Sequence, residues 1–459
     1  MENQIKQVLE EQKAYYSKGT TRDLKARKNI LRKLKSEIET REKDICNALY
    51  SDFKKSEFES LLSETQYILG ELKDAIKKIY SWAKPKAVSP SLINFPSSAK
   101  IIKEPYGTVL IIAPWNYPFQ LAISPLIGAI AAGNTAVIKP SELTPNTANI
   151  ISEIISAVFP ENYVNVIQGD KDVSTALLKE RWDYIFFTGS PQVGKIVYQA
   201  AANNLTPVTL ELGGKNPCII DETAKLQQAA RRIVWGKFLN GGQTCIAPDY
   251  ILVASEVKDK LIAFLKEEII AAYSDNPKNS PDYPRIVNQR NFDRLADLID
   301  YEKVTFGGQI DRTDCYISPT LITEPSLDSD VMKEEIFGPL LPIISYNTEE
   351  EISDVISKYE KPLSLYVFSS RKNFSNKVMN QFSYGGGAIN DTIVHFVNKR
   401  LPFGGVGQSG IGAYHGNLTF DVFSHHKSVV RRGTWLDIPL KYAPYEGKLN
   451  LVKKLKNFI

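Results

Sequence analysis

The sequence predicts an α/β protein with a doubly wound parallel sheet, a second α/β domain and a small arm. Three observations predict this class. Short apolar runs alternate with helical stretches from Tyr106 onward, as in parallel sheets that are covered by helices on both faces. The chain has 459 residues, more than one hydrophobic core normally serves, so two or three domains are expected. Polar residues follow several of the apolar runs, and ligands bind beyond strand ends in such sheets.

The composition is that of a soluble globular protein. Hydrophobic residues make up 43% and charged residues 24% of the chain, and the net charge of +4 is spread along it, which gives no case for nucleic acid. The cysteines are too unevenly spaced for a disulfide framework or a zinc site, so we expect no metal and a reducing compartment. They are Cys46, Cys218, Cys245 and Cys315. The charged N-terminus lacks the apolar run of a signal peptide, which favours the cytoplasm.

The longest uncharged segment lies between Glu104 and Lys139 and has the length of a membrane span. Four prolines and the polar residues Asn116 and Gln120 would interrupt a spanning helix. Strand, loop and buried helix therefore explain it better, and no transmembrane span is expected.

Residues 1–84 have the pattern of charged amphipathic helices, the last of which ends at Pro85. Two apolar faces are expected, formed by Leu24, Leu31, Leu34 and Ile38, and by Phe58, Leu62, Leu69, Leu72, Ile76 and Ile79. The segment between Pro85 and Pro105 is rich in serine and proline and contains one short alternating stretch. It is expected to be a crossing arm.

The first α/β run has strands and helices in regular alternation. Strands are expected at 108–112, 136–139, 164–168, 184–187 and 207–210, and helices at 122–132, 148–158, 173–178 and 191–202. The second run begins after Gly214, with helices at 224–239 and 258–272 and strands at 250–254, 340–345 and 364–368.

The C-terminal tail contains a strand-like stretch at 427–430 and a basic amphipathic helix at 449–458. A packed or solvated helix is favoured for the latter, and a role at a membrane surface stays open.

A loop at residues 240–248 presents a single thiol, that of Cys245, between a helical stretch and an apolar strand. Cysteines in such chains are usually buried apolar residues. Here Asn240, Thr244 and two glycines surround the thiol with polar, flexible main chain, which suits a reacting group better than core packing.

A second turn, at residues 188–194, follows a strand and opens a helix with Ser190 as N-cap and Pro191 in the first turn. Such a helix end binds phosphate through main-chain N–H groups. The glycine fingerprint of dinucleotide-binding sites would place glycines at 189, 191 and 194, but position 191 is proline. The turn alone therefore leaves a purely structural role open.

These loops, taken together with five further motifs, resemble the aldehyde dehydrogenase superfamily. The motifs stand in the family's order and cover nearly the whole chain, at residues 114–118, 139–142, 187–190, 211–215, 240–248, 335–339 and 402–405. The short N-terminus and residues 390–396 look most like the class 3 branch, which oxidises fatty and aromatic aldehydes.

The resemblance implies oxidation of an aldehyde to a carboxylic acid with hydride transfer to NAD or NADP. Cys245 is then the nucleophile, the side chain of Asn116 and the backbone N–H of Cys245 hold the oxyanion, and Glu211 is the general base that releases the thioester. Spacing alone would instead make Glu211 the acid that binds the ribose, because it follows the glycine turn by about twenty residues. Lys215 is expected to support the thiolate electrostatically.

The resemblance also implies a cofactor site and a substrate pocket. The cofactor-binding residues expected from it are Ile112, Trp115, Lys139, Glu142, Gly189, Ser190, Val193, Gly194, Leu212, Glu335 and Phe337. Lys139 would attract the 2′-phosphate of NADP and Glu142 would repel it, so both cofactors are expected, with NAD somewhat preferred. Tyr117, Trp235 and Phe396 are expected to line an apolar funnel for medium or long aliphatic, or aromatic, aldehydes.

The same resemblance suggests how the chain is divided. Residues 1–86 and 105–213 would form the cofactor-binding domain and residues 214–412 the catalytic domain. Residues 87–104 and 425–459 would form the oligomerisation arm and C-terminal tail of a homodimer.

Three other functions stay open. A cysteine hydrolase would pair Cys245 with one of the four histidines, which are His395, His415, His425 and His426. An acylating dehydrogenase would pass the thioester to coenzyme A and would not need Glu211. A binding protein on the same fold would hold the cofactor without turnover.

Overall fold

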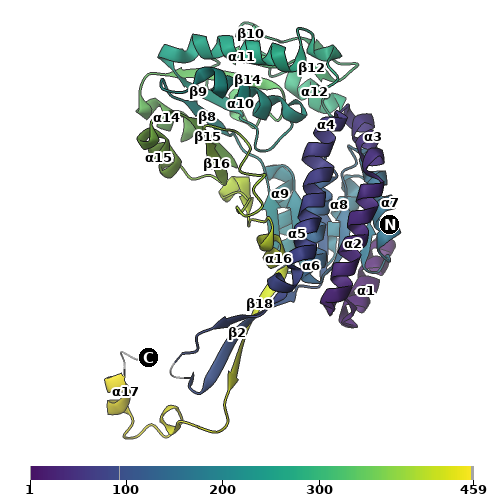
Figure 1. Ribbon diagram of the computed structural model, residues 1–459, viewed down its shortest axis with the longest axis vertical. Coiled ribbons are helices and arrows are strands. Elements are labelled where there is room, and N and C mark those ends of the chain that lie inside the picture. Colours follow the sequence, from purple (N-terminus) through teal and green to yellow (C-terminus); the bar gives the residue numbers. More distant parts are fainter. Residues whose placement is uncertain (1, 92–93, 456–459) are drawn as a thin grey trace.

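The computed structural model describes residues 2–91 and 94–455. Figure 1 shows two lobes, each built on its own sheet, and an arm that extends away from both. The N-terminal helices and a six-stranded sheet form one lobe, and a seven-stranded sheet forms the other. The expected α/β class, with a doubly wound sheet, a second α/β unit and an arm, is confirmed.

The N-terminal helices pack beside the first sheet. Most of their buried leucines and isoleucines lie in one core, whereas Ile5 and Leu9 lie in another. They are α1 (Glu2–Ser17), α2 (Leu24–Thr40), α3 (Glu42–Phe53), α4 (Glu57–Ser60) and α5 (Gln66–Ala83), and a π-helical turn, Leu61–Thr65, separates the last two. The prediction that Phe58 and Leu62 share the buried face is wrong, since they are 74% and 52% exposed. The wider π-turn changes the helical phase, so residues before it leave the apolar stripe of α5.

The six-stranded sheet has the reversal of strand order that defines a doubly wound fold. Its order is β17 (Gly410–Ile411), β7 (Val208–Glu211), β6 (Tyr184–Thr188), β3 (Thr108–Ile112), β4 (Thr135–Lys139) and β5 (Val164–Val166). The chain starts at β3, proceeds outward through β4 and β5, and then returns to β6 on the other side of β3. Ligands bind beyond the strand ends at such a reversal.

Four helices connect these strands: α6 (Gln120–Ala132), α7 (Pro145–Val158), α8 (Lys171–Lys179) and α9 (Pro191–Ala202). The uncharged segment between Glu104 and Lys139 forms β3, α6 and most of β4, all of them buried, as expected. In the described part of the chain, no helix combines the length and apolar character needed to cross a membrane.

The seven-stranded sheet is parallel apart from one edge strand, β10. Its order is β10 (Val304–Phe306), β13 (Thr320–Thr323), β14 (Leu340–Tyr346), β9 (Tyr250–Ala254), β8 (Pro217–Ile220), β15 (Ser364–Phe368) and β16 (Gly386–Ile389). Its helices are α10 (Leu226–Phe238), α11 (Lys258–Tyr273), α12 (Gln289–Ala296), α13 (Asp330–Lys333), α14 (Glu349–Ile356) and α15 (Lys372–Gln381). A two-stranded sheet, β11 (Ile310–Asp311) with β12 (Tyr316–Ile317), lies beside it.

The arm is a three-stranded antiparallel sheet of β1 (Lys86–Val88), β2 (Ser97–Pro105) and β18 (Ser424–Arg432). It connects to the body through Pro105 and through α16 (Asn417–Val422), and it projects beyond both lobes (Figure 1).

The last helix in the described part of the chain is α17 (Leu449–Leu455), whose Leu449, Leu451 and Val452 are exposed. Residues 456–458 of the predicted terminal helix lie outside the described residues.

One strand departs from the predicted division of the chain. Gly410 and Ile411, which were assigned to the catalytic domain, pair antiparallel with Glu211 and Leu210 and so extend the first sheet. The chain therefore returns to the six-stranded sheet just before it enters the arm.

Candidate active site

The loop that carries Cys245 begins with three consecutive residues in the left-handed region, Asn240, Gly241 and Gly242 (φ 56°, 63° and 76°). A Cβ on Gly242 would lie 2.3 Å from the carbonyl oxygen of Gly338, so only glycine permits this approach. The sharp turn reverses the chain after α10 and brings Cys245 into a cavity between the two lobes.

Two amide side chains hold this loop in place. Gln243 donates from Nε2 to the carbonyl oxygens of Asn240 and Arg285, 3.0 Å each, and its Oε1 accepts the N–H of Val287 at 3.0 Å. Asn216 donates from Nδ2 to the carbonyl oxygen of Cys245 at 2.7 Å. The backbone on both sides of the thiol is therefore fixed by hydrogen bonds to distant segments.

The thiol of Cys245 is partly exposed in a cavity of about 1030 Å³. Burial raises the pKa of this thiol, and the neighbouring carboxyl groups of Glu335 and Glu211 raise it further. Hydrogen bonding by the backbone N–H groups of Cys245 and Ile246 acts in the opposite direction. In this state the sulfur holds its proton, and two main-chain donors already face it.

Asn116 lies against the same loop and is almost fully buried. It donates from Nδ2 to the carbonyl oxygen of Gln243 at 3.0 Å, and its own carbonyl oxygen accepts Nδ2 of Asn240 at 2.8 Å. An amide nitrogen carries two hydrogens, so one remains available to a group in the cavity that Asn116 lines.

Glu211 is the last residue of β7 and lines the cavity. It is buried, and neither carboxyl oxygen has a hydrogen-bond partner in the structure. Burial raises its pKa well above the usual value. An unpartnered buried carboxyl in a cavity is a candidate for proton transfer.

Glu335 and Phe337 also line the cavity. Glu335 approaches the main chain so closely that a Cβ on Gly213 would lie 1.9 Å from its Oε2. Phe337 has a positive φ of 53°, and its ring meets Trp115 edge to face at 5.3 Å between centroids. Non-glycine residues in this region store strain, which concentrates at functional sites.

Lys215 does not support the thiolate as predicted. Its ammonium donates to Oδ2 of Asp249 at 2.6 Å and to the carbonyl oxygens of Val331 and Glu334 at 2.9 and 2.8 Å. All three of its donors are thus used to fix the chain that leads into Glu335.

The predicted cofactor residues fall into two groups. Those that line the cavity are Trp115, Gly189, Ser190, Leu212, Glu335 and Phe337. Five others lie at the same edge of the sheet without lining it: Ile112, Lys139, Glu142, Val193 and Gly194.

These five have identifiable surroundings. Ile112 and Lys139 are paired at the ends of β3 and β4, and the ammonium of Lys139 contacts Oε2 of Glu142 at 2.7 Å. A Cβ on Gly194 would lie 2.7 Å from Leu212, and the hydroxyl of Ser190 accepts the N–H of exposed Val193 as predicted for an N-cap.

The predicted pocket residues Tyr117, Trp235 and Phe396 all line the cavity, although Trp235 is 39% exposed at its rim. The sequence did not identify as pocket residues several apolar residues that join them from distant segments, namely Leu62, Tyr67, Leu121, Ile393, Phe403 and Tyr414. No local signal marks these residues, because each looks like an ordinary core position.

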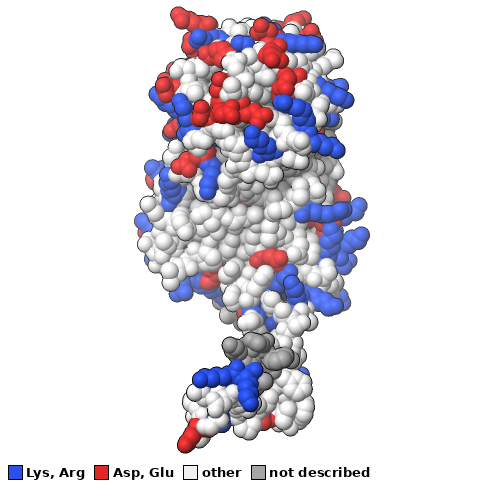
Figure 2. Space-filling view, turned by 90° about the vertical axis from the view of Figure 1, so that its left-hand side faces the viewer, with Lys and Arg blue, Asp and Glu red and all other residues white. Residues whose placement is uncertain are grey.

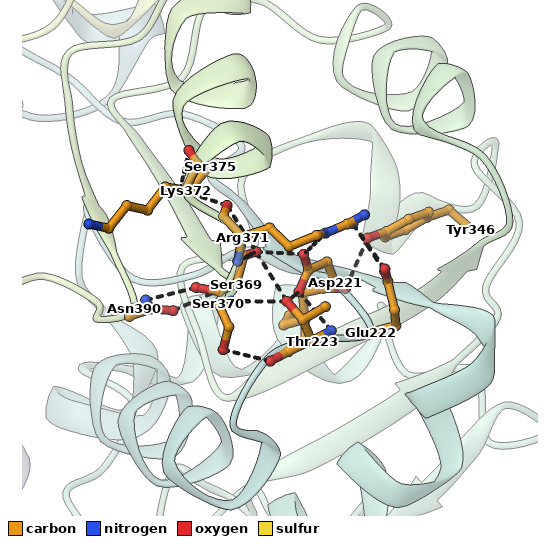
Figure 3. A network of polar contacts seen from close by, with 11 residues as sticks. Asp221, Glu222, Thr223, Tyr346, Ser369, Ser370, Arg371, Lys372, Ser375 and Asn390 are labelled. Atoms are coloured by element: carbon orange, nitrogen blue, oxygen red, sulfur yellow. Dashed lines mark hydrogen bonds and ion pairs between the residues drawn. The ribbon is translucent and has the colours of Figure 1, made fainter.

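The segment after β16 forms part of this apolar wall and is held by a polar network (Figure 3). Asn390 donates to the carbonyl oxygen of Ser369 at 3.0 Å and accepts its N–H at 2.9 Å. Buried Asp221 in turn accepts from the hydroxyl of Ser369 at 2.5 Å and from Nε of Arg371 at 3.0 Å. The network therefore ties the wall at Ile393 and Phe396 to the ends of β8 and β15.

None of the four histidines hydrogen bonds to Cys245 in the structure. Burial lowers the pKa of His395 to about 4, and the ring lies 3.4 Å from the hydroxyl of Ser364. His415 contacts the hydroxyl of Tyr67, and His425 and His426 lie on the arm strand β18. A hydrolase pair of cysteine and histidine is therefore not favoured.

Comparison with known proteins agrees with this geometry. The model of the aldehyde dehydrogenase family matches residues 1–429. The chain belongs to the aldehyde dehydrogenase family. It is 50% identical over 453 residues to a 4,4′-diaponeurosporen-aldehyde dehydrogenase of Staphylococcus aureus, covering 98% of this chain and 99% of the relative.

Two further relatives point the same way. The chain is 44% identical over 449 residues to a dimeric, NADP-preferring aldehyde dehydrogenase of Canis lupus familiaris, covering 97% and 99% of the two chains. A solved structure of Staphylococcus aureus AldH in a substrate-bound state has a TM-score of 0.97 with 49% identity, covering 98% and 99% of the chains.

This aldehyde dehydrogenase oxidises aldehydes with NAD or NADP, as the sequence implied. The residues present suit such a cofactor. Oε1 of Glu335 and the hydroxyl of Thr188 are buried at the cavity and have no partner among the described residues, and a ribose offers hydroxyl groups to both. The N-terminus of α9, with Gly189 and Ser190 at the cavity, provides main-chain donors for a phosphate.

Proposed function

We propose that the aldehyde dehydrogenase oxidises medium or long aliphatic aldehydes, or aromatic ones, at Cys245. The observation that carries this substrate class is the apolar part of the cavity, which is walled by Tyr67, Tyr117, Phe396 and Phe403. The Staphylococcus aureus relative is named a 4,4′-diaponeurosporen-aldehyde dehydrogenase, which supports an aldehyde as the substrate.

The Cys245 thiol first loses its proton to solvent water, and the resulting thiolate attacks the aldehyde carbonyl, which forms a carbon–sulfur bond and an oxyanion. The free hydrogen of the Asn116 amide and the backbone N–H of Cys245 are the donors proposed for that oxygen. Both are held by the loop before they meet the substrate, so little reorganisation is needed.

NAD or NADP, when bound, would supply the oxidising power as the hydride acceptor. Glu335 is proposed to hold the ribose hydroxyls and Phe337 to pack against the nicotinamide ring. Among the described residues, Lys139 and Glu142 are proposed to face the adenosine ribose, where the ion pair between them sets the balance between the two cofactors.

Oxidation leaves a thioester on Cys245, and Glu211 is proposed to release it. The unpartnered carboxylate takes a proton from water, the resulting hydroxide attacks the thioester carbon, and the carbon–sulfur bond breaks to give the carboxylic acid and the thiolate.

A homodimer in the cytoplasm is part of the proposal. Figure 2 shows a broad face between the upper lobe and the arm with few charged side chains, and α9 lies on this side of the molecule in Figure 1. Ile196 and Tyr198 of α9 are exposed by about half. The relative from Canis lupus familiaris is named as dimeric, and the four free cysteines suit a reducing compartment.

The proposal is tested by a series of aldehydes of increasing chain length, with benzaldehyde included, followed by absorbance of NADH and NADPH. We expect kcat/KM to rise with chain length and both cofactors to be reduced. A maximum at acetaldehyde would contradict the proposed substrate class. Light scattering that gives a monomer at micromolar concentration would contradict the dimer.

A further inference from the structure

A buried ion pair lies beneath the substrate side of the cavity and has no part in the chemistry described above. Lys55 stands in the short connection between α3 and α4, and its ammonium lies 2.9 Å from Oε1 of Glu64. Both side chains are fully shielded from solvent. Desolvation usually cancels the energy of such a pair, so a role in positioning explains it better than stability does.

Glu64 is fixed on its other side as well. Its Oε2 accepts the N–H of Gln120 at 2.7 Å, at the start of α6. Glu64 belongs to the π-helical turn, and Leu62 and Ser63 of the same turn line the cavity. Such turns are frequent at functional sites.

The ammonium of Lys55 also faces an aromatic ring of the pocket. It lies 4.1 Å from the centroid of the Tyr117 ring, a cation–π distance at which a desolvated cation is attracted strongly. The hydroxyl of Tyr117 lies 2.7 Å from Oγ1 of Thr244, the residue before Cys245. A continuous chain of contacts therefore joins the N-terminal helices to the nucleophile loop.

The protonation of Tyr117 suits a donor. Burial, and then the nearby carboxyl of Glu59, raise the pKa of Tyr117 well above its usual value, so the phenol keeps its proton. If Tyr117 donates to Thr244, the Thr244 hydroxyl retains its own hydrogen for a partner in the cavity that it lines.

We propose that Lys55, Glu64 and Tyr117 are positioning residues for the nucleophile loop, acting through the hydroxyl of Thr244. The ion pair fixes the ring of Tyr117, and the ring fixes the residue that precedes Cys245. The inference rests on the proposed role of Cys245 as nucleophile.

The first test is Tyr117→Phe, which keeps the ring and removes only the hydroxyl. We expect kcat/KM for the aldehyde to fall about tenfold, as for loss of one hydrogen bond, while the Kd of NADH is unchanged. Alkylation of Cys245 by iodoacetamide, followed by mass spectrometry of its peptide, should slow in parallel. An unchanged alkylation rate, or a fall confined to NADH affinity, overturns the proposal.

The second test is a double-mutant cycle. Lys55→Met combined with Glu64→Gln removes both charges together, so neither is left buried alone. This pair should lower kcat/KM in the wild-type background and have no further effect with Tyr117→Phe, because it acts through that hydroxyl. If the losses in kcat/KM instead multiply when the charge-free pair is combined with Tyr117→Phe, the proposal is overturned. Lys35→Met, which removes an exposed ion pair with Glu39, is the control and should change nothing.

A third comparison keeps the test decisive if the variant that combines Lys55→Met with Glu64→Gln does not fold. Thr244→Val and Tyr117→Phe should then be non-additive, since they break the same hydrogen bond. If Cys245→Ala abolishes aldehyde oxidation but Tyr117→Phe leaves it at the wild-type level, this inference alone is overturned. The proposed function then stands.

Discussion

Two carboxyl groups, those of Glu211 and Glu335, raise the pKa of the Cys245 thiol but lie in different surroundings. Burial and Asp249 raise the pKa of Glu335, whereas the N–H of Gly214 and the charges of Lys215 and Arg294 lower it, with a net rise to about 8. Glu211 has no such partners, and burial alone raises its pKa well above the usual value. The two surroundings support the two different tasks that we propose for the same residue type.

The difference shows how environment assigns the role. Positive and hydrogen-bonding neighbours hold Glu335 in one place and make it a suitable acceptor for a ribose hydroxyl. The lack of partners around Glu211 leaves its oxygens free for water, as a general base requires. Substitution of Glu211, of Glu335 and of the residues around them tests whether the two carboxyl groups have different tasks.

The largest effect should follow from removing the thiol that both carboxyls face. Cys245→Ala should abolish NADH production, because no other cysteine lines the cavity among the described residues. Steady-state assays with a long aldehyde check this. Cys315→Ser, at a partly exposed cysteine outside the cavity, is the matched control and should retain full activity.

Glu211→Gln separates the base from the ribose acid most directly. We expect steady-state turnover to fall about 10²- to 10⁴-fold, the usual contribution of a general base. Stopped-flow absorbance should still show a burst of NADH, because the base acts after hydride transfer. A weakened affinity for NAD without a burst of NADH would show that Glu211 binds the ribose. Glu211 and Glu335 would then not have different tasks.

Asn116→Ala should lower kcat by about a hundred- to a thousandfold, the effect of removing one oxyanion donor. Affinity for NAD, measured by fluorescence titration with NADH, should change little. A change limited to that affinity would make Asn116 a positioning residue of the cofactor site.

Glu335→Gln should instead act on the cofactor and on its pH dependence. The folded pKa of about 8 lies above the ordinary 4.5, so between these values stability falls as pH rises, because only the unfolded carboxyl ionises. Binding of ribose hydroxyls favours the ionised form, so NADH affinity should rise with pH up to about 8 in the wild type. Titration calorimetry should find a weaker, pH-independent affinity in the variant, and a persisting pH slope would assign the effect elsewhere.

The smallest effect concerns the choice between NAD and NADP. Glu142→Gln removes the half-exposed partner of Lys139 and the repulsion of a 2′-phosphate. We expect the ratio of kcat/KM for NADP over NAD to rise by roughly threefold, in keeping with the small energies of exposed charges. An unchanged ratio would show that specificity is set by other residues.

The strands were predictable because each is a short apolar run bounded by turn residues. All five strands expected in the first α/β run are present, with ends that differ by at most two residues. The division into domains stays a prediction, and Gly410 shows its limit, since no local pattern announces that a two-residue strand returns to the first sheet.

The residues of the site were predictable as motifs, but their partners were not. The structure brings Cys245, Glu211 and Asn116 to one cavity, which supports the proposed roles without testing them. The ion pair of Lys55 with Glu64 joins residues nine positions apart on either side of α4, and that of Lys215 with Asp249 joins two loops. Such pairings depend on tertiary structure, so side-chain type alone predicts neither.

The contact between Gly242 and Gly338 has a consequence for the engineering of this enzyme. The nucleophile loop and the loop of Glu335 and Phe337 touch through main chain at a point where a Cβ would lie 2.3 Å from a carbonyl oxygen. In a variant library, substitutions in the loop of Glu335 and Phe337 are therefore limited by its close contact with the loop of Cys245. Substitutions near residue 338 should be selected together with compensating changes near residue 242, because single-site saturation of either position will return mostly inactive clones.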